Sequence, residues 1–403
     1  MPAPFVPPRG TTPLPRRTAL ADLAALVATA SGCGPVNALF RGRDNRTPPA
    51  PLTDLPDPAV AATVLWQRDA GSGIGDEYLI LTPAVGGGDL FVAGHRGDVM
   101  AIETATGRVR WAVDTDLPIS GGVGLGAVQL YLGTSGGEVL ALDRSDGQER
   151  WRTTVPSEVL TAPGYEADTV VVRTNAGHLL GLDAANGLRR WLYSYTVPAL
   201  SLRGISPPLV SRGTVFAGLD NGQLVVLTLA EGRLLLEALV SPPEGSNELE
   251  RLVDIDAPPV ISDGVLYLVS YQGNAVAVDL NSGASLWNRD FSSYAGLDTD
   301  GQLVFVVDDQ DHLWALEARS GGALWQQDVL AGRRLTRPVV AGDWVVVGDF
   351  DGYLHWFDPA DGRLVGRSRV AGDGFAAAPL WNDGVLYTLG RDGDLTALRP
   401  AAR

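Results

Sequence analysis

The sequence contains a single cysteine, Cys33, so no disulfide can form within the chain. Histidine and methionine are also scarce, with four and two residues among 403, and no two histidines have the spacing of a metal site. The chain carries 31 basic against 47 acidic side chains, a formal charge of −16. Because no basic stripe is available to meet phosphates, nucleic acid is not expected as a partner.

The most informative feature is a segment repeated eight times, which reads Gly-x-apolar-x-small-apolar-acid. A second glycine usually follows four residues later and then a tryptophan, as residues 137–143 are followed by Gly147 and Trp151. The copies begin at Gly97, Gly137, Gly177, Gly222, Gly273, Asp311, Gly352 and Gly393. A period of about 40 residues, with one strand-turn-strand signature in each copy, is typical of a β-propeller.

Two further apolar strands precede each copy, which makes four strands per unit. The last unit stops at Arg403 without an outer strand, whereas a spare strand around Trp66 precedes the first inner strand. We therefore predict an all-β fold, an eight-bladed propeller of four antiparallel strands per blade, with residues 63–69 closing the ring. We expect the repeated tryptophans to pack across to the next blade, and the small residue of each repeat, such as Ala141, to let neighbouring blades approach closely.

The first 60 residues lack the repeat. Arg16 and Arg17 precede a short apolar stretch and then small residues before Cys33, a pattern typical of a bacterial lipoprotein signal. The apolar stretch is too short to span a bilayer. A disordered N-terminus with an incidental cysteine and a twin-arginine export signal are the alternatives. The predicted domains are a signal peptide over 1–32, a lipid-anchored, Pro-rich tether over 33–60 with Cys33 as the lipidation site, and the propeller over 61–403.

No constellation of residues predicts an enzyme centre. Residues 308–311 and 349–352 are similar to fragments of calcium loops, but each stands where a hairpin turn is required and lacks the ligating glutamate. We predict no catalytic residue, no metal and no cofactor. The same repeat builds pyrroloquinoline-quinone dehydrogenases, which usually carry a vicinal cysteine pair that this chain cannot form. A quinone-dependent dehydrogenase is the alternative function.

The spacing of the repeats locates two insertions. From Gly107 the turn glycines are 40, 40, 45, 51, 38 and 41 residues apart. The two long steps fall in segments 197–204 and 241–256, each after an outer strand and before the next inner strand. Because such connections all emerge on one face of a propeller, we expect the two loops to share one rim on neighbouring blades.

The two loops carry complementary chemistry. The first offers Leu200, Leu202 and Arg203, and the second offers a run of charged residues that includes Asp254 and Asp256. Exposed apolar side chains rimmed by charge indicate a protein-binding site, in which Arg203 can pair with either aspartate or an acid can meet the partner directly. Leucines that fold inward between the blades are the alternative.

Four segments of the sequence are more specific than a generic propeller requires. They are Gly-Ser-Gly-Ile-Gly at 71–75, Leu-Ser-Leu-Arg-Gly at 200–204, Glu-Arg-Leu-Val-Asp-Ile-Asp at 250–256 and Gly-Tyr-Leu-His-Trp at 352–356. With these segments the chain resembles the BamB family, propeller lipoproteins of the outer-membrane β-barrel assembly machinery. The resemblance covers nearly the whole chain after the signal and departs from the family at Ala30, Leu236 and Gly366.

The resemblance implies a non-catalytic scaffold at the periplasmic face of the outer membrane. In the family the two loops dock onto a POTRA domain of BamA, which implies Leu200, Leu202, Arg203, Asp254 and Asp256 as the partner-binding residues here. Such a scaffold would support folding and insertion of outer-membrane proteins, either by orienting the POTRA domains or by contacting unfolded substrates. A propeller adaptor for another envelope protein is a further alternative.

Overall fold

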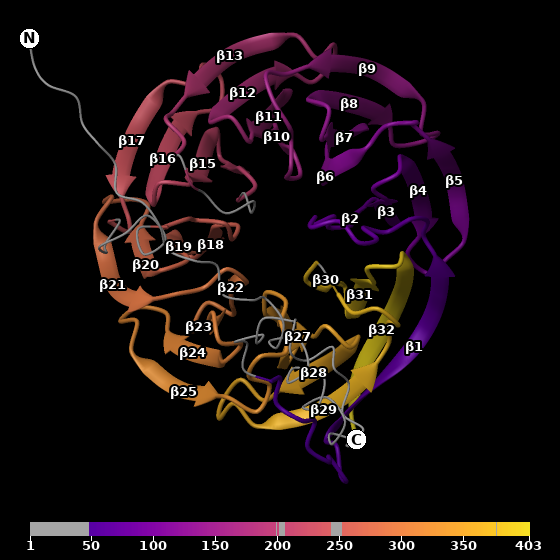
Figure 1. The fold of residues 1–403 in the computed structure, drawn as a ribbon, viewed down its shortest axis with the longest axis vertical. Helices are drawn as coiled ribbons and strands as arrows, with labels where there is room; N and C mark the ends of the chain where they lie inside the picture. Colours follow the sequence, from indigo (N-terminus) through magenta and orange to yellow (C-terminus); the bar gives the residue numbers. More distant parts are fainter. Residues whose placement is uncertain (1–47, 199, 201–205, 243–251, 376) are drawn as a thin grey trace, which may run out of the picture. The chain divides into compact units, whose positions relative to one another are not determined.

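The computed structural model describes residues 48–198, 200, 206–242, 252–375 and 377–403. Residues Pro48–Arg403 form one compact unit, which is an eight-bladed propeller (Figure 1). Its 32 strands form eight sheets of four hydrogen-bonded strands each. The predicted fold class and blade count are therefore confirmed.

The blades are numbered here in chain order, and their strands run from the centre of the ring outward. Blade 1 holds β2 (Ala84–Gly86), β3 (Asp89–Ala93), β4 (Asp98–Glu103) and β5 (Val109–Asp114). Blade 2 holds β6 (Ile119–Leu125), β7 (Gln129–Thr134), β8 (Glu138–Asp143) and β9 (Glu149–Thr154). Blade 3 holds β10 (Gly164–Glu166), β11 (Thr169–Thr174), β12 (His178–Asp183) and β13 (Arg189–Ser194). Blade 4 holds β14 (Leu209–Ser211), β15 (Thr214–Gly218), β16 (Gln223–Thr228) and β17 (Leu234–Leu239).

The second half of the ring repeats this order. Blade 5 holds β18 (Val260–Ser262), β19 (Val265–Val269), β20 (Gly273–Asp279) and β21 (Ser285–Phe291). Blade 6 holds β22 (Gly296–Thr299), β23 (Leu303–Val307), β24 (Leu313–Glu317) and β25 (Ala323–Gln327). Blade 7 holds β26 (Val339–Ala341), β27 (Trp344–Gly348), β28 (Tyr353–Phe357) and β29 (Leu364–Arg369). Blade 8 holds β30 (Leu380–Asn382), β31 (Val385–Leu389), β32 (Asp394–Ala402) and, as its outer strand, β1 (Val60–Asp69).

The N-terminal strand closes the ring, as predicted. β1 lies antiparallel to β32, with a register that runs from Val60 opposite Ala402 to Asp69 opposite Asp394. The two ends of the propeller chain are thereby held in one sheet, where Figure 1 shows the first and last strands side by side. This pairing supplies the missing outer strand of blade 8 and so covers the edge of β32.

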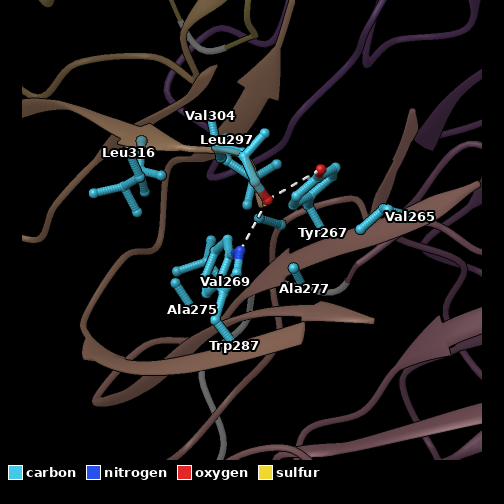
Figure 2. Close-up of a cluster of buried hydrophobic side chains, with 12 residues drawn as sticks. Val265, Tyr267, Val269, Ala275, Ala277, Trp287, Leu297, Val304 and Leu316 are labelled. Atoms are coloured by element: carbon cyan, nitrogen blue, oxygen red, sulfur yellow. Dashed lines mark hydrogen bonds between the residues drawn. The ribbon is translucent and has the colours of Figure 1, made fainter. Parts of the chain in front are cut away.

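In six of the eight blades the repeated tryptophan forms a hydrogen bond to the next blade. Trp287 of β21 donates its indole N–H to the Ala318 carbonyl of blade 6 at 2.9 Å, and Tyr267 donates its hydroxyl to the same oxygen at 3.3 Å (Figure 2). The ring of Trp287 also covers Gly321, where a β-carbon would lie 2.7 Å from the indole. Equivalent indole bonds, at 2.7–2.9 Å, are made by Trp66, Trp111, Trp151, Trp191 and Trp325.

The small residue of each repeat faces the tryptophan of its own blade, and its predicted effect on the approach of neighbouring blades stays a prediction. Ala141 lies directly opposite Trp151 of its own blade in the strand register, and Gly181 lies opposite Trp191. A β-carbon on Gly181 would lie 2.2 Å from that indole. The small residue therefore makes room for the tryptophan of its own sheet, and the glycine of the next blade is what receives the ring.

Blades 4 and 7 depart from this pairing in opposite ways. Blade 7 inverts it, because Trp356 lies opposite Gly366 and Val60 of β1 packs against the glycine. Blade 4 weakens it, because Val226 lies opposite Leu236, a side chain that is 41% exposed. No heavy atom lies within 4 Å of the position of a β-carbon at Gly283, the glycine that a blade 4 tryptophan would cover.

The residues before β1 form part of the folded propeller unit. Ala50 donates its amide to the Ala331 carbonyl at 2.8 Å and accepts a bond from Arg333. Arg367 donates to the Thr53 carbonyl at 2.7 Å. We call residues 48–58 the strap, because they run over blade 7 before β1 begins. The predicted signal peptide over 1–32 and Cys33 lie outside the described residues, so these assignments stay predictions.

Candidate partner-binding rim

The described parts of the two long loops meet on one rim, as the spacing of the repeats predicts. Ser206, at the end of the first loop, donates its hydroxyl to the Ala257 carbonyl at the end of the second at 2.9 Å. Within the second loop, the Ile255 amide faces the Leu219 carbonyl of blade 4, and the Asp254 carbonyl accepts the Tyr271 amide of blade 5 at 2.8 Å. Residues 252–257 thus bridge the strand-connecting turns of two neighbouring blades.

The apolar side chains of this bridge point inward. Val253 and Ile255 are 2% and 0% exposed. Ile255 lies so close to Gly218 of β15 that a β-carbon there would be 2.2 Å from its methyl group. The end of the second loop is therefore a packed layer on top of blade 4, and a larger residue at Gly218 would lift it.

The predicted site residues take different positions. Leu200 is 44% exposed and available to a partner. Asp254 is completely buried, so in this conformation it cannot touch a partner directly, whereas Asp256 is only partly buried. Leu202 and Arg203 lie outside the described residues, and their assignment as binding residues stays a prediction.

A buried arginine lies beneath the junction of the two loops. Arg173 of β11 is 0% exposed. It donates to the Tyr195 hydroxyl at 3.0 Å, to the Ser206 carbonyl at 3.1 Å and to the Gly218 carbonyl, and it forms an ion pair with Asp220 in the turn between β15 and β16. Its guanidinium thus joins segments of blades 3 and 4 through the fork of donors that only arginine provides.

Two more carboxyl groups crowd this cation. Asp254 and Asp256 interact with Arg173, with Asp220 and with each other. Burial, and after it the negative charge of Asp256, raises the pKa of Asp254 to about 9. Burial also raises the pKa of Asp256 to about 7, against the pull of Arg173. We call Arg173, Tyr195, Asp220, Asp254 and Asp256 the acid-rich cluster.

The acid-rich cluster holds three carboxyl groups against one guanidinium. Both carboxyl oxygens of Asp254 and one of Asp256 are buried without a hydrogen-bond donor among the described residues. A carboxyl group in that setting favours its protonated form, because burial penalises the charge and the neighbouring acid adds repulsion. The cluster is thus an electrostatically strained support for the loops rather than a surface that water can solvate.

Reasoning from the sequence missed Arg173 and Asp220. The signal was present, because Arg173 is the one charged residue in a buried strand, Thr-Val-Val-Val-Arg-Thr. It stands four residues before the first residue of its repeat copy, a position where the other seven repeats carry only small or apolar residues. These residues are Ala93, Gly133, Gly218, Val269, Val307, Gly348 and Leu389. Substitution within the repeat, and not only excess length, marked the site.

A second charged cluster lies on the same rim at blade 7. Arg333 is 4% exposed and forms ion pairs with Asp349 at 2.7 Å and Asp351 at 2.6 Å. His355, which is also buried, lies 2.9 Å from Asp349, and Arg367 approaches the other ring nitrogen at 3.3 Å. We call these five residues the paired cluster. Its two arginines also hold the strap, so this cluster fixes the point at which the chain enters the propeller.

Metal-binding clusters and membrane-spanning helices are absent from the described residues. No group of three or more His, Cys, Asp or Glu side chains is arranged to hold a metal ion in the part of the chain that the structure describes. The described segments likewise include no helix long and apolar enough to cross a membrane. The residues 308–311 and 349–352 form turns, in which Asp308 and Asp349 accept backbone amides.

Comparison with known proteins identifies the family. A family model described as Outer membrane protein assembly factor BamB matches residues 59–121, 110–327 and 315–402. The chain belongs to the BamB family. It is 49% identical over 383 residues to Outer membrane protein assembly factor BamB of Alkalilimnicola ehrlichii, which covers 95% of this chain and 97% of that protein. It is 47% identical over 377 residues to the Pseudomonas aeruginosa protein of the same name, with 94% and 97% covered.

Solved structures agree with this assignment. The crystal structure of BamB from Moraxella catarrhalis matches with a TM-score of 0.78 at 28% identity, over 84% of this chain and all of that one. Quinohemoprotein alcohol dehydrogenase from Comamonas testosteroni matches with a TM-score of 0.64 at 16% identity, over 84% of this chain and 76% of that one. At that identity the dehydrogenase shares the propeller fold, and the likeness extends no further.

Proposed function

We propose that this BamB-family chain is a non-catalytic scaffold of the outer-membrane β-barrel assembly complex. It would bind a POTRA domain of BamA through the rim that carries the two long loops, and so support folding and insertion of outer-membrane proteins. The observation that carries the proposal is the 49% identity, over 95% of the chain, to a protein named an outer membrane protein assembly factor.

The rim supports this proposal by its shape and chemistry. Leu200 of the first loop is exposed, and the Ser206–Ala257 bond holds the two loops in contact. An exposed apolar side chain on a surface that also carries charged groups fits an interface with an apolar centre and a polar rim. We propose Leu200, Leu202 and Arg203 as direct contacts, with Asp256 at their edge and Asp254 acting from below.

We further propose that lipid on Cys33 anchors the chain at the periplasmic face of the outer membrane. The family name places its members in outer-membrane assembly, and the Cys33 segment supplies a candidate lipid attachment site. Under this proposal a Cys33→Ser variant leaves the membrane fraction on cell fractionation. Retention of that variant in the membrane to the wild-type extent contradicts lipid anchoring.

Binding is tested directly with the chain from residue 34 onward and the POTRA domains of BamA from the same organism. Biolayer interferometry of Leu200→Ala, Leu202→Ala and Arg203→Ala should each show affinity reduced by at least about tenfold, since truncating an interface anchor costs about 2 kcal/mol. Leu188→Ala is the matched control, because Leu188 is 68% exposed at a turn on the opposite rim.

The outcomes separate the alternatives. Equal affinity for the wild type and the three rim variants would show that BamA docks elsewhere. Absence of binding by the wild type, with capture of a different envelope protein from native membranes, would favour an adaptor function. Dye-linked alcohol oxidation after addition of pyrroloquinoline quinone and calcium would favour the dehydrogenase alternative.

A further inference from the structure

We propose that Arg173 is the positioning residue of the partner-binding rim, a buried clamp that holds both long loops in the arrangement that BamA recognises. The inference rests on the proposed function, because it says how the binding surface of that function is maintained. It assigns a role to a residue that touches no partner and lies in a strand of blade 3.

Arg173 joins the two ends of the first loop. Tyr195 comes directly after β13 and before the first loop, and Ser206 comes directly after that loop. Arg173 donates to both, at 3.0 Å and 3.1 Å. One guanidinium therefore fixes the distance between the two ends of the first loop, and its ion pair with Asp220 ties both ends to blade 4.

Arg173 is also linked to the second loop, through Ser206 and Gly218. Ser206, which accepts from Arg173 through its carbonyl, donates its hydroxyl to Ala257. Gly218, whose carbonyl also accepts from Arg173, lies under Ile255. Arg173 in addition acts electrostatically on Asp254 and Asp256, the two acids on either side of Ile255. Both loops therefore depend on the same buried group.

A buried arginine at this position carries a desolvation cost that the other repeats avoid. Seven of the eight repeats build the equivalent strand position from a small or apolar residue, so the propeller itself does not need a cation there. Burying a guanidinium is unfavourable unless its hydrogen bonds and its charge are met. All the groups that meet them flank or underlie the two long loops, which points to the loops as the reason for the arginine.

The experiment measures POTRA affinity for an uncharged replacement of the buried pair. Arg173→Gln combined with Asp220→Asn removes both charges and keeps side chains of similar size, so the fold is retained and melting serves as the check. We expect at least a tenfold loss of affinity. Hydrogen exchange should rise at amides 195–197 and 252–257, which flank the loops, while strands of blades 1 and 8 keep wild-type protection.

The matched control is Arg333→Gln, which removes a buried, ion-paired arginine from the same rim at blade 7. It should lower stability without changing POTRA affinity. A double-mutant cycle with Leu202→Ala separates positioning from general destabilisation. Because Arg173 acts through the loop, combining the two changes should cost little more affinity than the larger single effect.

Wild-type affinity in the Arg173→Gln/Asp220→Asn variant would overturn the inference, and so would fully additive losses with Leu202→Ala. If wild-type protein itself fails to bind the POTRA domains, the proposed function fails instead. Hydrogen exchange then still decides the clamp, because unchanged exchange at 195–197 and 252–257 in the double variant would refute it without any partner present.

Discussion

The acid-rich cluster and the paired cluster are both buried arginine–aspartate groups on one rim of the propeller, and they solve the same problem in opposite ways. At blade 7, burial works against the Asp349 carboxylate, but bonds from His355, the Tyr353 amide and Arg333 outweigh it and lower the pKa of Asp349. Beneath the long loops, burial prevails and raises the pKa of Asp254 to about 9.

The two clusters therefore respond to pH with opposite sign. A carboxyl whose pKa rises on folding holds its proton more tightly in the folded state, so stability falls as pH climbs from about 4, toward 7 for Asp256 and 9 for Asp254. A carboxyl with a lowered pKa contributes stability above its unfolded value and loses it as pH falls, as at Asp349. The first arrangement is typical of a support kept for function, and the second of a structural joint.

The largest expected effect comes from breaking the structural joint. Asp349→Asn leaves the buried Arg333 with only Asp351 as a charged partner and weakens the bond to His355. We expect a loss of about 3 kcal/mol in the free energy of unfolding at pH 7, measured by urea denaturation. Asp351→Asn is the control, because Asp351 is 45% exposed and its removal should cost below about 1 kcal/mol.

The opposite change should strengthen the acid-rich cluster. Asp254→Asn replaces a group that must stay protonated with a neutral one of the same shape. It should raise the free energy of unfolding at pH 8 by about 2 kcal/mol and flatten the decline of stability between pH 5 and pH 9. The same substitution at the exposed Asp57 should do neither. A destabilised Asp254→Asn protein would show that Asp254 is an ion-paired carboxylate.

The tryptophan positions of blades 7 and 4, which carry the two clusters, offer a third comparison. Blade 7 keeps a tryptophan by exchanging it with its glycine partner, whereas blade 4 has only Val226 and Leu236. Leu236→Trp together with Val226→Ala rebuilds the ordinary pair and places an indole N–H near the Leu280 carbonyl. We expect a gain of about 1–2 kcal/mol from ring burial and the added bond, seen as a higher melting temperature. Leu236→Trp alone should gain less, because Val226 occupies the space of the ring.

The smallest effect concerns the strap. Arg367→Ala removes the bond to the Thr53 carbonyl and should cost below about 1 kcal/mol in global stability, because the group is at the surface of blade 7. Its signature should be local, as faster hydrogen exchange at 50–58 with unchanged exchange in β1. Arg369→Ala, at an exposed position on the same strand, is the control and should leave exchange of the strap unchanged.

The fold could be predicted from the sequence because each copy of the repeat marks the strands of one blade. Ring closure by Trp66, the eight sheets and the shared rim of the loops all follow from the repeat and its spacing. The burial of Asp254 could not be predicted, because it depends on Ile255 packing over Gly218 of another blade. Arg173 stands out within the repeat, but its partners could not be predicted, because they come from segments 22 to 47 residues away along the chain.

The strap also determines how the propeller would respond to a mechanical load. A pull applied to the chain before Pro48 meets first the Ala50 and Thr53 carbonyls held by Arg333 and Arg367, and only afterwards β1. These contacts break one after another, because each is a separate hydrogen bond from a different arginine. The closing strand of the ring, bonded along its whole length to β32, is spared until the strap has peeled away. The strap is a strain relief for the strand that closes the ring.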